Sequence, residues 1–284
     1  MKWGGVCPVC RGTIEPLWTV RSYDYYRCQR CTSLTVDPEV VADVDAGRAV
    51  RAAYEARAPE EQATSLDRAY GASLACVAEA ILYARVPVRR FVDVGAGHGY
   101  LLDALRLHLP AHAGAFFGVE PFPPEPHSTH PNYLAGPPAA LPHKVDAGCC
   151  IEVLQQLTPA QAGGLLAELA SRSHPGALYV LNFGQPRYVL DEDPEYLDPD
   201  GRGHLVSYSA MGLGVLAEPL GFRVIPLRGR AWSLLLEYDL VDTTAPQDRI
   251  WTALPENRAL LRDPERGSVL HELGMASARA YEPG

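Results

Sequence analysis

Residues 91–100 have the sequence FVDVGAGHGY and are the most informative part of the chain for its architecture. Residues 91–94 are apolar enough for a short buried strand, residues 95–99 form a glycine-rich loop, and residues 100–109 have helical periodicity up to Pro110. Glycines at such a turn let the backbone approach a ligand closely and leave N–H groups free to bind it. The stretch therefore predicts a ligand-binding loop between a strand and a helix.

Strand and helix patterns alternate on both sides of this loop. We expect further strands at residues 115–120, 147–151, 177–183, 222–227 and 232–241, and further helices at residues 65–84, 159–171 and 207–220. The proline-rich stretches at residues 121–126 and 136–142 are expected to be loops at strand ends. Alternation of this kind favours parallel crossovers and a sheet covered by helices on both faces, so the predicted fold class is α/β.

A carboxylate ends the next expected strand. Open α/β sheets bind ligands at the carboxyl ends of their strands, and Glu120 lies about 20 residues after the loop, where an acidic side chain accepts hydrogen bonds from ribose hydroxyls. A dinucleotide-binding loop has a glycine three positions after its second glycine, but that position holds Tyr100 here. The third glycine, Gly99, comes two positions after Gly97. The spacing therefore departs from the dinucleotide pattern.

Several segments resemble motifs of one enzyme family, the class I S-adenosylmethionine (SAM) dependent methyltransferases. The matching segments are residues 91–100 (motif I), 118–121 (acidic motif II), 146–157 (the motif after the fourth strand), and 203–209 with 221–222 (a late segment of the bacterial small-molecule branch). Several members of that branch also begin with a cysteine ribbon. The resemblance implies a Rossmann-like sheet with helices on both faces, preceded by a small zinc ribbon.

The resemblance also implies a set of contacts to SAM. The glycine loop would line the methionine end of SAM, Asp93 would help to hold its amino group, and Glu120 would take the ribose. The loop around Leu141 would lie near the adenine. The full set of expected cofactor-binding residues is Asp93, Gly95, Ala96, Gly97, Gly99, Glu120, Pro121, Leu141, Ile151 and Glu152.

Catalysis with a sulfonium methyl donor needs mainly a well-placed nucleophile. A general base is required only when the acceptor is a poor nucleophile such as a hydroxyl or an acidic carbon. The candidate catalytic residues are His98, His204 and Tyr208, although His98 is favoured as a residue that merely packs over the cofactor. Gln155 and Gln156 replace the Glu-His pair of many relatives, so a catalytic scheme cannot be transferred directly.

The cysteines fall into two groups. Cys7, Cys10, Cys28 and Cys31 form two Cys-x-x-Cys pairs separated by the seventeen positions 11–27, a spacing typical of a structural zinc site with four thiolate ligands. Disulfides are the alternative, disfavoured in a cytoplasmic protein. The remaining cysteines lie in apolar runs and are expected to be small core residues: Cys76, Cys149 and Cys150.

Composition narrows the classes of protein. The chain has 284 residues, 47% of them hydrophobic, which is enough for one large domain and a small one. The net charge of -9 disfavours nucleic acid as a partner. The absence of a stretch of about 18 apolar residues predicts a cytoplasmic protein with no membrane partner. The expected division is residues 1–40 (zinc ribbon), 41–88 (linker and helical lead-in), 89–242 (SAM-binding domain) and 243–284 (C-terminal extension).

Three functions fit these observations. The first is methyl transfer from SAM to a small-molecule acceptor, with secondary metabolism as the expected setting. The second is an RNA methyltransferase that uses the ribbon to contact RNA, which the acidic charge disfavours. The third is a SAM-binding enzyme that does not methylate, such as a cyclase. Residues 187–196, an acidic stretch, are expected to be a lid over the acceptor or solvated surface. A homodimer is compatible with the sequence.

Overall fold

The structure is a computed structural model that describes residues 5–47, 59–240, 242 and 244–280. Its central sheet has the strand order β10-β11-β8-β7-β4-β5-β6. The strands are β4 Phe91–Val94, β5 Phe116–Glu120, β6 Tyr133–Ala135, β7 Val145–Ile151, β8 Ser173–Asn182, β10 Phe222–Pro226 and β11 Ser233–Tyr238. The strands from β8 to β6 are parallel to their neighbours, whereas β11 is antiparallel to β8 and to β10.

The topology of this sheet places the ligand site. When β11 is left out and the remaining strands are numbered along the chain, their order across the sheet is 3-2-1-4-5-6. This is the order of a doubly wound Rossmann-type sheet. The order reverses between β4 and β7, and in such sheets the ligand binds in the crevice outside the carboxyl ends of the strands at this switch point. The predicted α/β, Rossmann-like fold class is confirmed, and the glycine loop after β4 lies at the switch point.

The expectation of parallel crossovers is wrong for the last strand. β11 is antiparallel because six residues, 227–232, connect it to β10, and so short a segment forms a hairpin but cannot cross the sheet. The structure also contains β6, a three-residue strand that the sequence pattern does not predict. Residue 241, the last position of the expected strand 232–241, lies outside the described residues.

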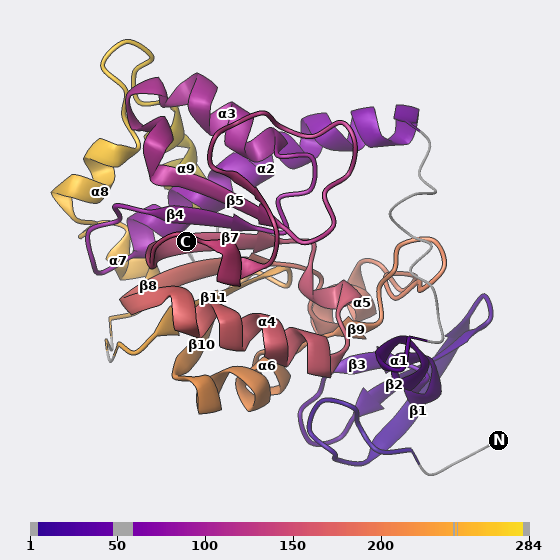
Figure 1. Cartoon of the computed structure of the whole chain (residues 1–284). Helices are drawn as coiled ribbons and strands as arrows, with labels where there is room; N and C mark the ends of the chain where they lie inside the picture. Colours follow the sequence, from indigo (N-terminus) through magenta and orange to yellow (C-terminus); the bar gives the residue numbers. More distant parts are fainter. Residues whose placement is uncertain (1–4, 48–58, 241, 243, 281–284) are drawn as a thin grey trace.

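Helices cover both faces of the sheet (Figure 1). α2 Pro59–Tyr83, α3 Tyr100–His108 and α9 Val269–Arg279 lie on one face, and α4 Pro159–Arg172 and α6 Ala210–Ala217 lie on the other. The expected helices at 65–84, 100–109 and 159–171 are confirmed within a few residues. The expected helix at 207–220 begins later, at Ala210, because residues 206–207 form strand β9 and the Ser209 side chain caps the helix by accepting from the Gly212 N–H.

An N-terminal unit packs beside the edge of the main domain (Figure 1). It consists of β1 Ile14–Val20, β2 Tyr23–Cys28, β3 Leu34–Val36 and α1 Pro38–Asp45. Its sheet has the order β1-β2-β3-β9, so its fourth strand, β9 Val206–Ser207, comes from the main domain. The buried apolar side chains of the unit belong to the same cluster as those on one face of the main sheet. The four-part division of the chain stays a proposal.

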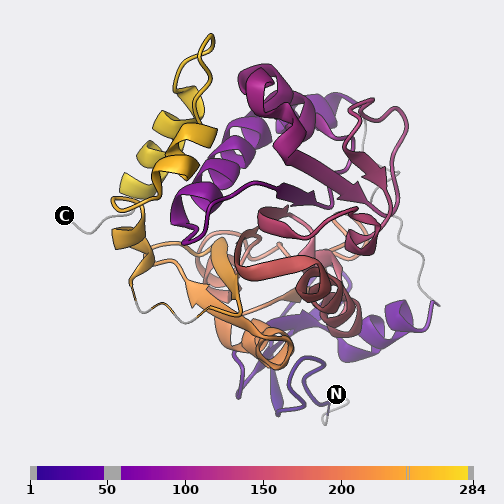
Figure 2. The same cartoon turned by 60° about the vertical axis from the view of Figure 1, so that its left-hand side comes forward.

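The C-terminal residues form α7 Pro246–Arg249, α8 Pro255–Leu260 and α9. Figure 2 shows these helices against α2. A Cβ atom at Gly274 of α9 would lie 2.7 Å from the Cβ of Ala78 of α2, so the two helices are in close contact. Among the described residues, no helix combines the length and the apolarity that a membrane span requires.

Candidate active site

The predicted glycine loop has a backbone that other residues would not adopt readily. Gly95, Gly97 and Gly99 have φ values of 77°, 52° and 80°, in the left-handed region where a side chain causes strain. A Cβ atom at Gly95 would lie only 2.4 Å from a methyl carbon of Val153. The Gly95 N–H donates to the Val119 carbonyl at 2.9 Å, which ties the loop to β5. At its three glycines the loop therefore presents backbone without side chains at the switch point.

Glu120 closes this loop from the end of β5. Its Oε2 accepts a hydrogen bond from the Gly97 N–H at 2.9 Å, and its Oε1 accepts one from the Phe122 N–H at 3.0 Å. Each carboxylate oxygen has a second lone pair, so these bonds leave capacity for the hydroxyls of a ribose. Ala96 precedes Gly97 in the chain, and Pro121 follows Glu120. Both are also expected near the cofactor.

Asp93 lies in β4, directly before the loop. Its side chain is 5% exposed, and its Oδ1 accepts a hydrogen bond from Cys149 Sγ at 3.4 Å. Burial raises the pKa of Asp93 to about 7, the Cys149 hydrogen bond opposes this rise, and the Glu120 carboxylate adds to it. Two carboxylates thus lie near one another at the ends of β4 and β5.

A third carboxylate follows β7, whose last residue is Ile151. Glu152 has a φ of 55°, a strained value for a residue with a side chain. Its N–H donates to the Asn182 carbonyl at 2.8 Å, and its Oε2 accepts from Gln155 Nε2 at 2.6 Å. The Glu152 side chain is 51% exposed, so the carboxylate is held firmly but can still be reached from solvent.

His204 lies next to Glu152. The His204 Nδ1 is 2.8 Å from the Tyr196 carbonyl, and because a carbonyl only accepts, Nδ1 carries the proton. The lone pair is then on Nε2, which accepts from Gln155 Nε2 at 3.3 Å and lies 4.0 Å from Glu152 Oε2. Within the described part of the chain, the buried Gln155 Oε1 has no hydrogen-bond partner. Nε2 could accept a proton from an acceptor molecule only when the Gln155 amide gives up this bond.

The other predicted residues have different surroundings. Tyr208 is fully buried, and its hydroxyl donates to the Leu157 carbonyl at 2.9 Å. His98 Nδ1 lies 2.6 Å from the carbonyl of Pro126 in the loop after β5. Leu141 is 2% exposed. The catalytic roles of Tyr208 and His98 stay predictions.

Two neighbours of His204 were not among the predicted site residues. Tyr196 is 5% exposed, its hydroxyl accepts from the Gly184 N–H at 2.7 Å, and its ring centroid lies 4.5 Å from that of His204. Tyr196 is the last residue of the acidic stretch 187–196. An aromatic residue among acidic ones is the local sequence signal that could have identified it. In the sequence, Gln155 stands out only as a departure from the family pattern. Its contact with His204 joins positions 49 apart in the sequence, which no local pattern shows.

The four N-terminal cysteines form a buried cluster. Their sulfur atoms lie within 4.8 Å of one another, with Cys7 to Cys31 at 3.8 Å and Cys10 to Cys28 at 3.4 Å. Tetrahedral zinc with Zn–S bonds of about 2.3 Å separates its sulfur ligands by about 3.8 Å, so the cluster fits such an ion. The hydrogen bond between Cys7 and Cys31 lowers the pKa of Cys31 and raises that of Cys7. The other three cysteines are buried as expected.

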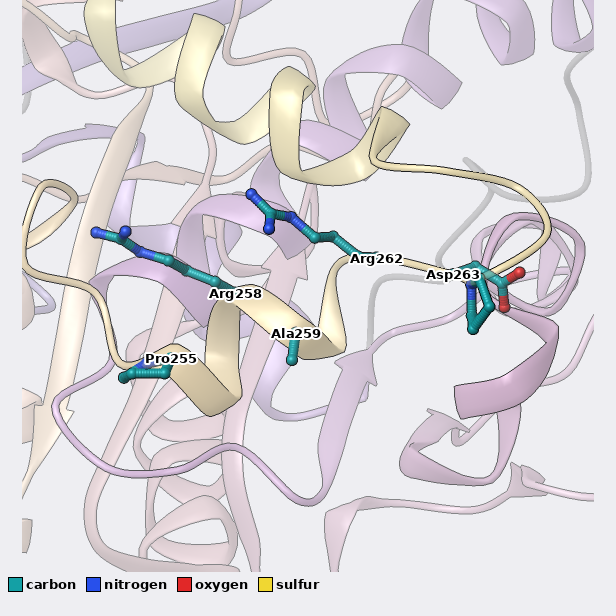
Figure 3. Close-up of a pocket in the computed structure, with 6 residues that line it drawn as sticks. Pro255, Arg258, Ala259, Arg262 and Asp263 are labelled. Atoms are coloured by element: carbon teal, nitrogen blue, oxygen red, sulfur yellow. The ribbon is translucent and has the colours of Figure 1, made fainter.

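A surface hollow of about 430 Å³ lies elsewhere, on α8 and the loop that follows it (Figure 3). Arg258, Arg262 and Asp263 contribute to its lining. α8 also contains Asn257, which accepts a hydrogen bond from the Val88 N–H just before β4 begins. The hollow therefore lies toward the amino end of β4, away from the glycine loop, and we assign no ligand to it.

Comparisons with known proteins give no family for this chain. No protein-family model matches the chain, and no curated protein matches its sequence. Similar solved structures include a sugar N-methyltransferase from Streptoalloteichus (15% identity over 61% of this chain and 87% of that chain, TM-score 0.41). They also include the DesVI protein of Streptomyces venezuelae (16%, 65% and 100%, TM-score 0.46) and human N-acetylserotonin methyltransferase in complex with SAM (15%, 72% and 66%, TM-score 0.45).

Identities of this size do not transfer an activity from one chain to another. Function must therefore be inferred from the residues of the site.

Proposed function

We propose that this chain is a SAM-dependent methyltransferase that acts on a small-molecule acceptor. The observation that carries the proposal is the convergence of three carboxylates, Asp93, Glu120 and Glu152, at the carboxyl ends of three neighbouring strands around a glycine loop. SAM is a nucleoside that carries a positive sulfonium and a positive ammonium group. Carboxylates match both charges as well as the ribose hydroxyls.

The same carboxylates disfavour a dinucleotide. A pyrophosphate at this loop would lie near like charges, which are repulsive in a partly buried site. The loop also holds Tyr100 where the dinucleotide pattern has its third glycine. Because RNA is also negatively charged, the net charge of -9 favours a small acceptor over RNA. These features together support SAM and a small acceptor.

We distinguish a cofactor side and an acceptor side of the site. The glycine loop, Asp93 and Glu120 would hold SAM, which supplies a methyl group that is already electrophilic. Glu152 would lie between SAM and the acceptor. On the acceptor side, His204 would take a proton on Nε2 when the nucleophile loses one, once the bond from Gln155 Nε2 is released. We call residues 193–209, which carry His204, the acceptor segment.

The cysteine cluster would hold one structural zinc ion. Four thiolate ligands fill a tetrahedral shell and leave no position for a substrate. We expect one zinc per chain in protein purified without chelators, with Cys76, Cys149 and Cys150 uninvolved. Elemental analysis of the wild type and of Cys28→Ser would test this, and a zinc-free wild type would contradict it.

The proposed activity is tested first by ligand choice. Calorimetric titration of SAM and of NAD⁺ into the same preparation should give saturable binding of SAM and none of NAD⁺. Binding of NAD⁺ in preference to SAM would overturn the proposal. With SAM bound, mass spectrometry of mixtures with candidate small molecules should then show products heavier by one methylene, and consumption of SAM without such products would indicate a different reaction.

A further inference from the structure

We propose that Arg21 of the N-terminal unit is a positioning residue for His204, and that the unit as a whole holds the acceptor side of the site. The inference rests on the proposed function only where it calls this side the acceptor side. The N-terminal unit therefore serves the reaction without contacting SAM.

The link from Arg21 to His204 passes through Asp198. Arg21 Nη1 donates to Asp198 Oδ2, and Asp198 is only 5% exposed. The Asp198 carbonyl accepts from the N–H groups of Arg202, at 2.9 Å, and His204, at 3.2 Å. The other carboxylate oxygen, Oδ1, accepts from the Gly201 N–H at 2.9 Å. Asp198 thus organises the turn that ends at His204, and Arg21 neutralises the charge of its nearly buried carboxylate.

Neighbouring side chains of the β1–β2 hairpin contact the same segment. The buried Tyr25 donates its hydroxyl hydrogen to the Leu197 carbonyl, and Tyr23 donates to Asp200 Oδ1 at 2.8 Å. From β1, Trp18 Nε1 lies 3.4 Å from the Pro194 carbonyl. These contacts come from separate side chains, so the hairpin fits the segment over its length from residue 194 to residue 200.

Backbone pairing completes the connection on the far side of His204. β3 pairs with β9, the strand that follows His204 in the chain. The Val36 N–H also donates to the Leu205 carbonyl at 3.1 Å. The Ser209 hydroxyl donates to the carbonyl of Cys31, a residue of the cysteine cluster. His204 is therefore held from both sides by a unit whose own fold depends on the cluster.

An isolated surface ion pair contributes little to stability. The pair of Arg21 and Asp198 differs because one partner is nearly buried, so loss of Arg21 leaves a carboxylate without its counter-charge. The expected consequence is local: the turn at residues 198–204 loosens, while the glycine loop and Glu120, which depend on β4 and β5, keep their geometry.

The test compares full-length variants by hydrogen exchange and by SAM titration. In Arg21→Ala, amide exchange of residues 198–204 should become at least about tenfold faster than in the wild type, with SAM affinity unchanged within about twofold. Arg21→Lys retains the charge and should restore most of the protection. Arg187→Ala is the matched control, because it removes an exposed arginine that pairs with Asp191 near the same segment.

Two further measurements keep the outcome clear. Tyr25→Phe removes one hydroxyl without creating a charge. Treatment of the wild type with a zinc chelator acts on the whole N-terminal unit. Both changes should increase amide exchange in the acceptor segment. Unchanged exchange in Arg21→Ala and after chelation would overturn the inference, as would equal effects of Arg21→Ala and Arg187→Ala. Failure of the wild type to bind SAM would instead remove the proposed function and leave the exchange result standing.

Discussion

Gly95 illustrates how one residue of the loop meets two requirements at once. Its φ of 77° is strained for other residues, and a Cβ atom would overlap a methyl carbon of Val153 at 2.4 Å. We expect Gly95→Ala to lower the free energy of unfolding by about 2–4 kcal/mol, through backbone strain and overpacking together. SAM affinity should fall by at least about tenfold because the loop must shift. Urea titration and calorimetry measure the two effects.

Gly267 supplies the matched control for this variant. Its φ is 82°, but a Cβ atom there would meet nothing within 4 Å. Gly267→Ala should therefore lose only the strain energy of about 1–2 kcal/mol and should bind SAM normally. If the two variants lost the same stability, the close contact between Gly95 and Val153 would have no energetic importance.

Asp93 should make stability depend on pH. Burial raises its pKa from 3.8 to about 7, so between these values the unfolded chain loses a proton that the folded chain keeps. This group's contribution to stability is fully present below about pH 4 and is lost as the pH rises to about 7. The loss amounts to at most about 1.4 kcal/mol for each pH unit in the window. Asp93→Asn should remove this slope, as measured by urea titrations from pH 4 to 8.

A slope that is the same in the wild type and in Asp93→Asn would show that Asp93 does not titrate in this range. Comparison of the two proteins also cancels the pH dependence of the cysteine cluster, because both contain it.

Local patterns were sufficient to predict residues near the glycine loop, but not those around His204. Asp93 and Glu120 each end or nearly end a strand that can be recognised from its apolar residues, and the sheet brings such ends together. His204, Gln155 and Tyr196 meet only because a long connection folds back on the end of β7. A pattern read over a few residues contains no information about such a return.

Among the helices, α8 depends on one buried side chain. Asn257 accepts from the Val88 N–H at 2.8 Å and donates to the carbonyls of Ile81 at 3.0 Å and Val86 at 3.1 Å. We expect Asn257→Ala to lower the free energy of unfolding by about 2–4 kcal/mol, because it leaves these buried backbone groups without partners. The exposed neighbour Glu256, changed to alanine, should alter stability by less than about 0.5 kcal/mol.

Equal effects of the two substitutions, measured by urea titration, would mean that α8 is not attached through Asn257. The C-terminal extension had no interpretation from the sequence. The structure gives it one, since this asparagine fixes α8 to the end of α2 and to the start of β4.

The long, periodic elements could be predicted, and the short ones could not. α4 begins at the Thr158 capping box and Pro159, which are local signals, and its range was anticipated closely. β6 has three residues and β9 has two, too few for any period to appear. β11 was found as a strand, but its direction follows from the length of a connection and not from its composition.

For the molecule as a whole, the main departure from expectation is how the N-terminal unit is attached. The expected division separates the ribbon, residues 1–40, from the SAM-binding domain, residues 89–242. The pairing of β3 with β9 and the Arg21–Asp198 contact connect the unit to the acceptor segment. We expect Cys28→Ser to bind SAM, because the glycine loop and Glu120 lie outside the unit, whereas its acceptor segment should lose order.

The central claim is that the carboxyl ends of β4 and β5 bind SAM, and Glu120 is the residue on which it depends most. Because Glu120 also accepts two loop N–H groups, Glu120→Ala removes loop contacts as well as contacts to a ribose. Glu120→Gln removes the charge and keeps one acceptor oxygen, so it should disturb the loop less than alanine does. Glu125→Ala, in the loop after β5, is the control because its side chain is 81% exposed.

Calorimetric titration of SAM into the wild type and these three variants, each checked for its melting temperature without ligand, is the most direct test. Charge-assisted hydrogen bonds contribute about 1.5–3 kcal/mol each, so SAM affinity should fall by at least about tenfold in Glu120→Ala and in Glu120→Gln. Glu125→Ala should bind like the wild type. Equal affinities in all four proteins would remove Glu120 from the site, and no heat of binding in a zinc-containing wild type would contradict the account.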